Sequence, residues 1–323
     1  MSTASVHEFT ADLIVRRRDT PAEGVAVLDL GYPDDSELPR WQPGAHIDLM
    51  LGDDVIRQYS LCGDPRDVKT WRVGVLLDPN SRGGSRYVHE NLHEGATVQV
   101  RGPRNHFPMV DAVQYRFIAG GIGITPIMAM LESAQQAGSE WTLLYGGRTR
   151  ASMAFADELA ARYPARVTVW PQDERGLLDL PALLSEPADD TMVYCCGPEA
   201  LLNAVEQQCS IWPRGALHIE RFTAKAITAE QEAAALDQFE VVCQRSGVTI
   251  EVNADDSVLE LVEAAGVPIT TSCYEGVCGS CVAQVLEGVP DHRDSVLTLE
   301  QKESGRVILC TARSRTKRLV LDL

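Results

Sequence analysis

The stretch Cys273-Tyr-Glu-Gly-Val-Cys278-Gly-Ser-Cys281, followed at a distance by Cys310, decides the fold of the C-terminal part of this chain. Its spacing, with four residues, then two, then a distant cysteine, is that of the ligands of a [2Fe–2S] cluster. Each iron takes two thiolates, so a tight loop must bring three sulfurs and a separate segment the fourth. Gly276 and Gly279 allow that loop to turn inward. A structural zinc site is the alternative, but it usually repeats a C-x-x-C pair, which is present here once.

The residues around this loop predict a small mixed sheet. Residues 239–244 and 248–252 alternate in polarity as two strands on either side of the turn Arg245-Ser246-Gly247. Ser257 is a helix cap for residues 258–265, and further strands are expected at residues 282–286 and 318–323. This order resembles the β-grasp fold of plant-type ferredoxins over residues 237–323.

Composition excludes several classes of partner. A net charge of −17 argues against nucleic acid and anionic membranes, because nothing would neutralise their phosphates. No apolar run is long enough to span a bilayer, and the first residues lack a signal peptide, so neither membrane insertion nor export is expected. The cysteines outside the cluster set are odd in number and lack disulfide spacing, which predicts a reducing, cytoplasmic location: Cys62, Cys195, Cys196, Cys209 and Cys243.

The first hundred residues predict an antiparallel β-barrel, because short alternating segments are separated by Gly, Pro and Asp turns. Two motifs stand within it. Arg57-Gln-Tyr59-Ser60 is weak by itself, but Arg82-Gly83-Gly84-Ser85 follows and opens a helix expected at residues 87–92. Glycines and a serine at a helix start, beside an arginine, form a plausible phosphate cradle.

From residue 115 the pattern changes to an α/β domain with a parallel sheet. A buried strand leads into Gly120-Gly121-Ile-Gly123-Ile-Thr125-Pro126 and then a helix at residues 127–136, which is the geometry that binds a dinucleotide pyrophosphate. Cys196-Gly197-Pro198 repeats the strand end, glycine turn and helix start. Cys196 by itself is more readily explained as a small buried residue. Further strands are expected at residues 141–145, 166–170 and 192–196, and helices at residues 153–162, 180–184 and 199–208.

These patterns divide the chain into a β-barrel domain (1–110), a nucleotide domain (111–224), a linker (225–236) and a ferredoxin module (237–323). The order of motifs resembles the phthalate dioxygenase reductase family across essentially the whole chain. That resemblance implies FMN, a [2Fe–2S] cluster, NAD(P)H and a separate terminal oxygenase as partner.

The resemblance also implies a role for each matching residue. Arg57, Tyr59 and Ser60 would hold and cover the flavin, with Ser60 close to its reactive nitrogen. Cys196 and Glu220 would shape the nicotinamide pocket, and in this context Cys196 is a site residue. The other expected binding residues are Gly74, Val75, Leu76, Arg82, Gly83, Gly84 and Ser85 for FMN, Gly121, Gly123, Thr125, Pro126, Gly197 and Pro198 for the nucleotide, Phe222 beside the flavin, and Cys273, Cys278, Cys281 and Cys310 for the cluster.

The choice of nucleotide rests on few residues. No acidic residue follows the strand at residues 141–145, where one would bind the ribose hydroxyls, and Arg148 and Arg150 stand there instead. The two arginines could meet a 2′-phosphate or could be plain surface charges. NADH is the expected donor, with NADPH as the alternative.

The expected function follows from electron counts. A nicotinamide gives two electrons and the cluster takes one, so a flavin must stand between them. The electrons would then pass singly to a Rieske-type oxygenase. Two alternatives are a reductase for a haem monooxygenase and, in another class, a flavin-free redox-sensing or binding protein. No Rieske pair or iron-binding triad is apparent, so this chain is not expected to oxygenate a substrate alone.

Overall fold

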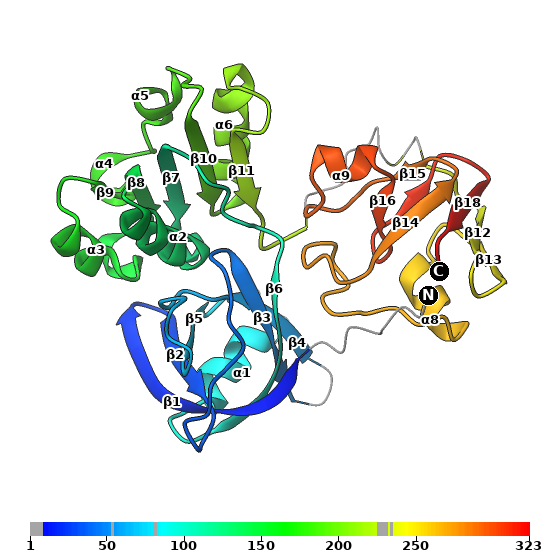
Figure 1. Cartoon of the computed structure of the whole chain (residues 1–323), viewed down its shortest axis with the longest axis horizontal. Helices are drawn as coiled ribbons and strands as arrows, with labels where there is room; N and C mark the ends of the chain where they lie inside the picture. Colours follow the sequence, from blue (N-terminus) through cyan, green and yellow to red (C-terminus); the bar gives the residue numbers. More distant parts are fainter. Residues whose placement is uncertain (1–8, 53–54, 80–82, 225–231, 233–234) are drawn as a thin grey trace. The chain divides into compact units, whose positions relative to one another are not determined.

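The computed structural model describes residues 9–52, 55–79, 83–224, 232 and 235–323. The chain forms two compact units, Met1–Glu220 and Arg221–Leu323. The first unit contains an antiparallel sheet and a parallel sheet, and the second contains a mixed sheet (Figure 1).

The antiparallel sheet of the first unit closes into a barrel. Its strand order is β4-β3-β6-β1-β2-β5, and a bridge between Leu61 and Val73 joins the end of β4 to β5. Helix α1 (Gly84–Asn91) packs Val88 into the barrel core. The strands are β1 (Thr10–Ala22), β2 (Val25–Gly31), β3 (Ala45–Leu51), β4 (Val55–Ser60), β5 (Trp71–Leu76) and β6 (Thr97–Asn105).

The parallel sheet has the order β11-β10-β7-β8-β9. Its strands are β7 (Gln114–Gly120), β8 (Glu140–Gly147), β9 (Val167–Pro171), β10 (Thr191–Cys196) and β11 (Leu217–Glu220). Helices α2 (Ile124–Ala137) and α3 (Ala156–Arg162) pack on one face, and α5 (Leu180–Leu184) and α6 (Glu199–Gln208) on the other. Shorter segments are α4 (Gln172–Arg175), η1 (Gly121–Gly123), η2 (Arg150–Ser152) and η3 (Cys209–Ile211).

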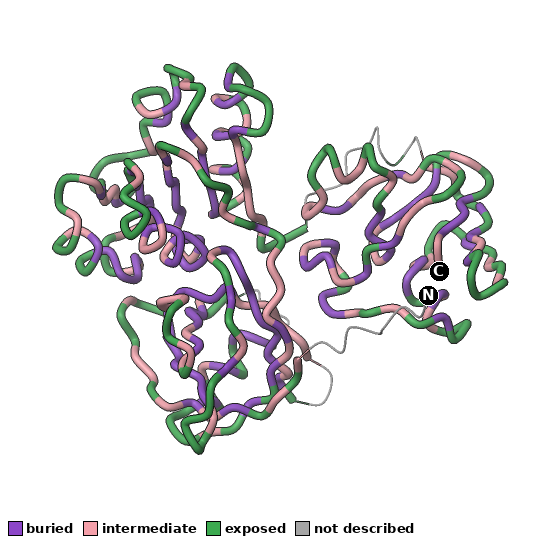
Figure 2. Tube along the Cα trace, in the orientation of Figure 1, coloured by how far each residue is buried: buried purple, intermediate pink, exposed green. Residues whose placement is uncertain are grey.

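One hydrophobic core joins the barrel to the parallel sheet. Val25 and Val27 of β2 belong to the same buried cluster as α2 and β7. The Tyr194 hydroxyl on β10 donates to the Pro108 carbonyl at 3.1 Å and accepts from the Val110 amide at 2.8 Å. Tyr194 therefore holds the segment between β6 and β7, which connects the barrel to the parallel sheet. The buried strands of both sheets are visible in Figure 2. This shared core explains why the first unit is compact although it holds two sheets.

The second unit has the β-grasp arrangement that the sequence predicts. Its sheet has the order β13-β12-β18-β14-β16, with β12 and β18 parallel and the other pairs antiparallel. Helix α8 (Val258–Ala264) packs Val258, Leu259 and Val262 into the core, and the Ser257 hydroxyl caps it by accepting from the Glu260 amide. The elements are β12 (Phe239–Cys243), β13 (Val248–Val252), β14 (Val282–Glu287), β15 (Pro290–Asp291), α9 (Leu299–Glu303), β16 (Arg306–Ile308), β17 (Arg313–Ser314) and β18 (Arg318–Leu321).

Three helix starts differ from the sequence prediction. Helix α1 begins at Gly84, before the expected start at residue 87. Helix α2 begins at Ile124, so Thr125 and Pro126 lie inside its first turn. The helix expected over residues 153–162 is wrong at its start, because η2 ends at Ser152 and α3 begins at Ala156. Met153 packs so closely on Gly147 that a β-carbon there would lie 2.2 Å from Met153 Cγ, and Phe155 has a left-handed backbone with φ 63°. This packing interrupts the helix.

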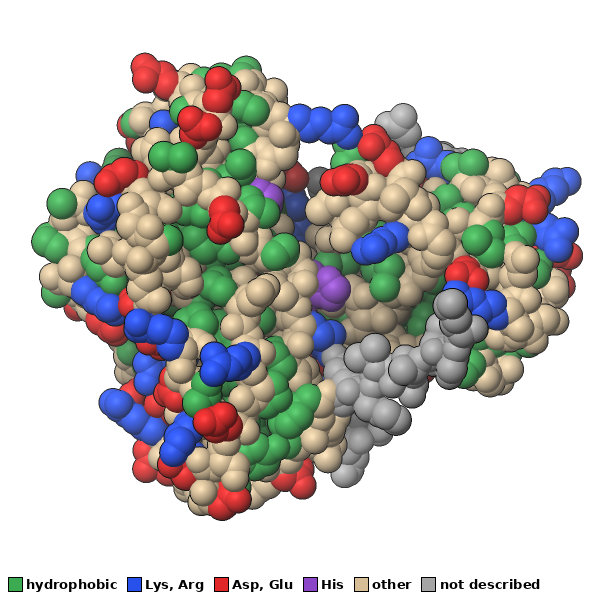
Figure 3. Space-filling model, viewed as in Figure 1, with side chains coloured by type: hydrophobic (Ala, Val, Ile, Leu, Met, Phe, Trp, Pro, Cys, Tyr) green, Lys and Arg blue, Asp and Glu red, His purple; other side chains and the backbone are tan. Residues whose placement is uncertain are grey.

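On the face of the molecule seen in Figure 3, acidic and basic side chains are interspersed. Among the described residues, no helix combines the length and the apolar character that crossing a membrane requires.

Candidate functional site

The four predicted ligand cysteines lie together at one end of the second unit. Cys273 is within hydrogen-bonding reach of Cys278 and Cys310, and Cys310 is within reach of Cys281. Among the described side chains no three acids, histidines or cysteines surround one point as ligands of a single ion would; the four sulfurs instead form a chain of neighbouring pairs. Cys273, Cys278 and Cys281 are buried, whereas Cys310 is partly exposed.

The loop around these sulfurs has the backbone that a cluster requires. Gly276 and Gly279 have φ of 73° and 70°, which residues with a β-carbon rarely adopt. A β-carbon at Gly276 would lie 2.8 Å from Thr311 Oγ1, so the segment that follows Cys310 packs directly on the loop. Hydrogen bonds from Cys278, Cys310 and the Glu275 amide lower the pKa of the Cys273 thiol. The donor set therefore fits a [2Fe–2S] cluster, with amides directed at sulfur.

The barrel motifs meet at the start of α1. Arg57 on β4 lies against Gly84, where an added β-carbon would be 2.5 Å from Arg57 Cγ. Gly83 is the N-cap with φ 93°, and no side chain caps the helix. Ser85 Oγ accepts a hydrogen bond from the Asp78 amide at 3.2 Å. Tyr59, on β4 near Arg57, is largely buried, and this burial raises the pKa of its hydroxyl group. This arrangement fits a flavin phosphate, because the N-terminus of α1, the Ser85 hydroxyl and the Arg57 side chain lie close together, and Gly84 leaves room for Arg57. Arg82 lies outside the described residues.

The two glycine turns of the parallel sheet are in backbone contact. A β-carbon at Gly123 would lie 2.3 Å from the Cys196 carbonyl oxygen and 2.7 Å from the Gly197 nitrogen. A β-carbon at Gly120 would lie 2.7 Å from Pro198 Cδ. These turns lie at the carboxyl ends of adjacent strands β7 and β10, the edge where open α/β sheets bind nucleotides.

The barrel strand β5 also touches the first glycine turn. A β-carbon at Gly74 would lie 2.8 Å from Thr125 Cγ2, and Thr125 Oγ1 donates to the Ile122 carbonyl at 3.0 Å. Gly74 and Val75 are buried and Leu76 is partly buried on this strand. The structure therefore brings the predicted flavin strand and the predicted nucleotide turn together within one compact unit.

Cys196 and Glu220 are opposite each other in the register of β10 and β11. Burial raises the pKa of Glu220 to about 8, and Oε2 of its carboxyl group is buried without a hydrogen-bond partner in the described part of the chain. Burial, and then the Glu220 charge, raise the pKa of the Cys196 thiol well above its ordinary value. Burial therefore favours the neutral form of both groups, and Glu220 Oε2 keeps unused hydrogen-bonding capacity among the described residues.

Two predicted residues need separate mention. Ser60 is buried at the end of β4, paired in register with His46 of β3. Phe222 is exposed and belongs to the second compact unit, which begins directly after Glu220.

Tyr145 is a residue that the sequence analysis missed. Its hydroxyl lies 3.2 Å from the Gly121 carbonyl oxygen and 3.0 Å from the Ala154 carbonyl oxygen. Tyr145 therefore links the glycine turn to the segment before α3. A tyrosine near the end of a buried strand is a signal for such a contact, because a buried phenol needs a polar partner.

Comparisons with known proteins agree with this geometry. Residues 117–207 match the oxidoreductase NAD-binding domain, and residues 241–315 match the 2Fe-2S iron-sulfur cluster binding domain. Phenoxybenzoate dioxygenase subunit beta of Ectopseudomonas oleovorans is 40% identical over 305 residues, which cover 94% of each chain.

Two of the solved structures that are similar over 97% of this chain bear on its function. Phthalate dioxygenase reductase, described as a modular structure for electron transfer from pyridine nucleotides to [2Fe-2S], is 32% identical with a TM-score of 0.72, and 98% of it is covered. An intact type IV self-sufficient cytochrome P450 monooxygenase is 43% identical with a TM-score of 0.89, but this chain spans only 41% of it.

Fold, site and comparisons define an NAD(P)H-dependent flavin and iron–sulfur reductase that transfers electrons to oxygenases. Within that class, the chain belongs to the phthalate dioxygenase reductase family.

Proposed function

We propose that this reductase uses NADH as donor and FMN as flavin, and that it delivers single electrons to a Rieske-type oxygenase. The observation that carries the proposal is the contact between Gly74 of β5 and Thr125 of the nucleotide turn. A flavin held along β5 and a nucleotide held at that turn would be neighbours, as hydride transfer requires.

FMN is supported by the start of α1. Gly83, Gly84 and Ser85 would bind the phosphate through backbone amides and a hydroxyl, and Arg57 would balance its charge. Such a terminal phosphate site suits a mononucleotide flavin. Tyr59 and Ser60 would border the ring from β4, while backbone groups of Gly74, Val75 and Leu76 would meet its edge. We include Arg82 and Phe222 in the flavin site from the family resemblance alone.

Nucleotide binding would use the paired turns. Gly121, Gly123, Thr125 and Pro126 would leave the N-terminal amides of α2 open to the pyrophosphate. Gly197 and Pro198 would border the nicotinamide, and Cys196 would present a neutral thiol to it. Glu220 holds its proton at neutral pH and would donate a hydrogen bond to the ligand without adding a charge.

When bound, the flavin accepts an electron pair and releases electrons singly, and the cluster carries one electron at a time. The protein would position these groups, with Cys196 buried and Glu220 partly buried beside it. Cys273, Cys278, Cys281 and Cys310 would hold the irons, with the partly exposed Cys310 side as an electron exit.

A Rieske-type partner is supported by the relatives named as dioxygenase components. A haem monooxygenase partner is the second candidate, because the P450 monooxygenase structure is 43% identical over almost all of this chain. The cysteines outside the cluster set, Cys62, Cys195, Cys196, Cys209 and Cys243, form no disulfide, which supports a reducing, cytoplasmic location.

The test is an anaerobic titration of the purified protein with NADH, and separately with NADPH, followed by ultraviolet–visible spectroscopy. We expect bleaching of both the flavin band and the broader iron–sulfur absorption, with NADH the more effective donor. A spectrum without flavin, or a flavin that neither nucleotide reduces, would contradict the proposal and favour a flavin-free sensor. Single-turnover mixing of the reduced protein with a purified Rieske oxygenase and with a haem monooxygenase would then rank the two partners.

A further inference from the structure

The hydroxyl group of Thr311 is a buried hydrogen-bond donor beside the cysteine loop. Thr311 follows Cys310 directly, in the segment that delivers the fourth sulfur. Its Oγ1 atom is buried and has no hydrogen-bond partner among the described residues. A buried hydroxyl without a partner lowers stability, because it has lost its hydrogen bonds to water and gained none in exchange. Such a group indicates that its acceptor is a bound group.

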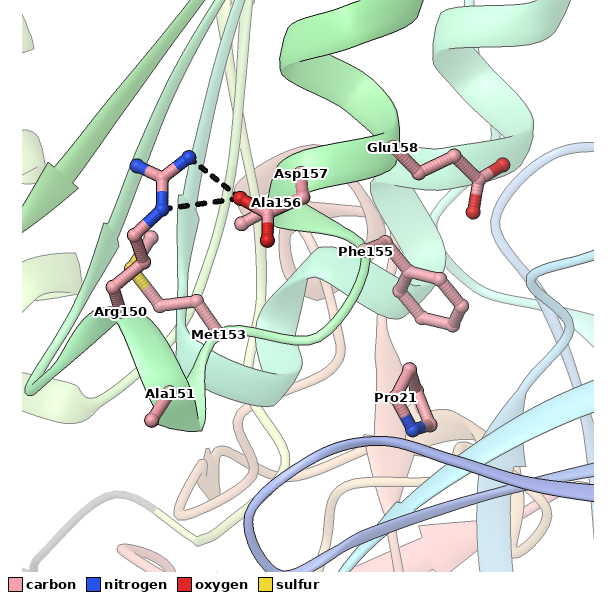
Figure 4. A pocket seen from close by; sticks show the side chains of 8 residues that line it. All are labelled: Pro21, Arg150, Ala151, Met153, Phe155, Ala156, Asp157 and Glu158. Atoms are coloured by element: carbon pink, nitrogen blue, oxygen red, sulfur yellow. Dashed lines mark hydrogen bonds and ion pairs between the residues drawn. The ribbon is translucent and has the colours of Figure 1, made fainter.

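The hollow beside α3 shows the contrast. It has a volume of about 460 Å³, and its apolar walls include Met153 and Phe155 (Figure 4). Its charged side chains Arg150 and Asp157 pair with each other, since Arg150 Nε donates to Asp157 Oδ1 at 3.0 Å (Figure 4). These two charges satisfy one another, whereas the hydroxyl of Thr311 has no partner in the described part of the chain.

Thr311 lies against the loop that carries three of the ligands. A β-carbon added at Gly276, between Cys273 and Cys278, would be 2.8 Å from Thr311 Oγ1. Cys273 is in turn within hydrogen-bonding reach of Cys310, the residue before Thr311. The absence of a side chain at position 276 therefore leaves the room that the hydroxyl occupies between the loop and the segment with the fourth ligand.

Two oxygen acceptors near the hydroxyl do not take its hydrogen bond. The Gly276 carbonyl accepts from the Ser295 amide at 3.0 Å. Asp294 is also close, because its Cα would lie 3.3 Å from the same added β-carbon. Its Oδ2 accepts from the Leu297 amide at 2.8 Å, and its Oδ1 is itself buried without a partner, so Thr311 does not donate to it. The neighbouring ligand sulfurs carry charge when iron is bound, which makes them strong acceptors.

We propose that the Thr311 hydroxyl donates a hydrogen bond to a sulfur of the bound [2Fe–2S] cluster and thereby raises its reduction potential. A donor at sulfur stabilises the reduced cluster more than the oxidised one, because reduction adds negative charge. The electron comes from the flavin, and the hydroxyl keeps its proton. One hydroxyl of the loop already neighbours a ligand sulfur, since Ser280 Oγ lies 3.3 Å from Cys278 Sγ. The inference rests on the cluster site and not on the choice of nucleotide, flavin or partner oxygenase.

The experiment compares the full-length holoprotein with Thr311→Val, which keeps the shape of the side chain and removes the hydroxyl. The readout is the midpoint potential of the cluster, from an anaerobic dye-mediated titration followed by EPR of the reduced cluster. We expect the equilibrium constant for one-electron reduction to fall about three- to tenfold, which is about 30 to 60 mV at 59 mV per tenfold change. Pulsed EPR of the reduced protein in D₂O should also show a deuteron coupling that Thr311→Val loses.

Two further variants separate the hydroxyl from packing. Thr311→Ser keeps the hydroxyl and loses only a methyl group. Thr249→Val makes the same change as Thr311→Val on β13, where the side chain of Thr249 is exposed. In both variants we expect the equilibrium constant to change by less than about twofold. Iron content confirms that each protein holds its cluster.

An unchanged potential in Thr311→Val would overturn the inference. An equal fall in Thr311→Ser would also overturn it, because packing would then set the potential. If Thr311→Val binds no cluster, Thr311→Ala takes its place: a fall that Thr311→Ser does not share supports the inference, and any other result overturns it.

Failure of the proposed function would be visible separately. If the unmodified protein has no [2Fe–2S] signal, the cluster site itself is wrong. If the unmodified protein passes electrons from NADH to cytochrome c and only the potential is insensitive to Thr311, the proposed function stands and this inference alone is wrong.

Discussion

Cys310 is the ligand that a separate segment delivers to the cysteine loop. We expect Cys310→Ser to abolish electron transfer to cytochrome c and to lower bound iron, because one iron loses a thiolate. Flavin reduction by NADH should continue at an unchanged rate, since the flavin motifs lie in the other compact unit. Iron analysis, the visible spectrum and stopped-flow reduction measure these effects.

Cys243→Ser is the matched control, because Cys243 is a buried free thiol of the same unit at the end of β12. It should lose some stability but keep its iron. Loss of flavin reduction in a folded Cys310→Ser protein would contradict the proposed serial order.

Glu220 should make stability depend on pH. Burial raises its pKa from 4.5 to about 8, so as pH rises the unfolded chain releases this proton before the folded protein does. The contribution of Glu220 is fully present below about pH 4.5 and is lost as pH rises to about 8. Glu220→Gln cannot ionise and removes this dependence.

In the nucleotide-free protein, the melting temperature of the native form relative to Glu220→Gln should fall by roughly 5 °C between pH 5 and pH 8.5. Thermal scans of both proteins in the same buffers give this difference. A constant difference across the range would mean that Glu220 is not held neutral.

At the scale of elements, the contact between the ends of β7 and β10 depends on a glycine. Gly123 has an ordinary helical backbone with φ −61°, so only space limits substitution there, and an alanine β-carbon would meet the Cys196 carbonyl at 2.3 Å. We expect Gly123→Ala to lower the free energy of unfolding of the first unit by about 2–3 kcal/mol, because two backbones must separate.

Gly121→Ala is the comparison within the same turn. Gly121 has φ 54° and open space around a β-carbon, so its cost is backbone strain of about 1 kcal/mol. Urea denaturation of both variants tests the order. If Gly121→Ala is the more destabilised protein, the packing of the turns is not the limiting factor.

At the scale of the whole molecule, we propose domain limits at residues 110/111, 224/225 and 236/237. Residues 225–231, 233 and 234, most of the proposed linker, lie outside the described part of the chain. From Leu236 onward the chain is hydrogen-bonded to the rest of the second unit. The Leu236 amide donates to the Ser314 carbonyl at 2.9 Å, and Arg313 donates to the Leu236 and Asp237 carbonyls.

We expect limited proteolysis to cut within residues 225–235, before the hydrogen-bonded Leu236, and to yield two folded fragments. The larger should retain NADH-dependent flavin reduction, and the smaller should retain the cluster spectrum. Mixed at micromolar concentration, the fragments should reduce cytochrome c at least about tenfold more slowly than the intact chain, because the linker supplies an effective concentration near millimolar. Equal rates would mean that the connection has no kinetic role.

Features that depend on neighbours in the chain could be predicted from the sequence. The cysteine spacing predicts the loop, the glycine turns predict the strand-to-helix transitions, and Ser257 predicts the start of α8. The start of α3 could not be predicted, because the packing of Met153 on Gly147 and the left-handed Phe155 interrupt a favourable helical pattern. The role of Tyr145 was missed for a similar reason, since its acceptors come from two other segments.

By itself, the sequence determined the modules and their order and predicted the four cysteine ligands, since spacing within a loop or turn is local information. Only the tertiary structure decided which modules meet. The contact of Gly74 with Thr125, the pairing of Cys196 with Glu220 and the ion pair of Arg150 with Asp157 depend on strand register and side-chain packing. These are set by the whole core, because residues distant in the chain become neighbours only when their apolar surfaces are buried together.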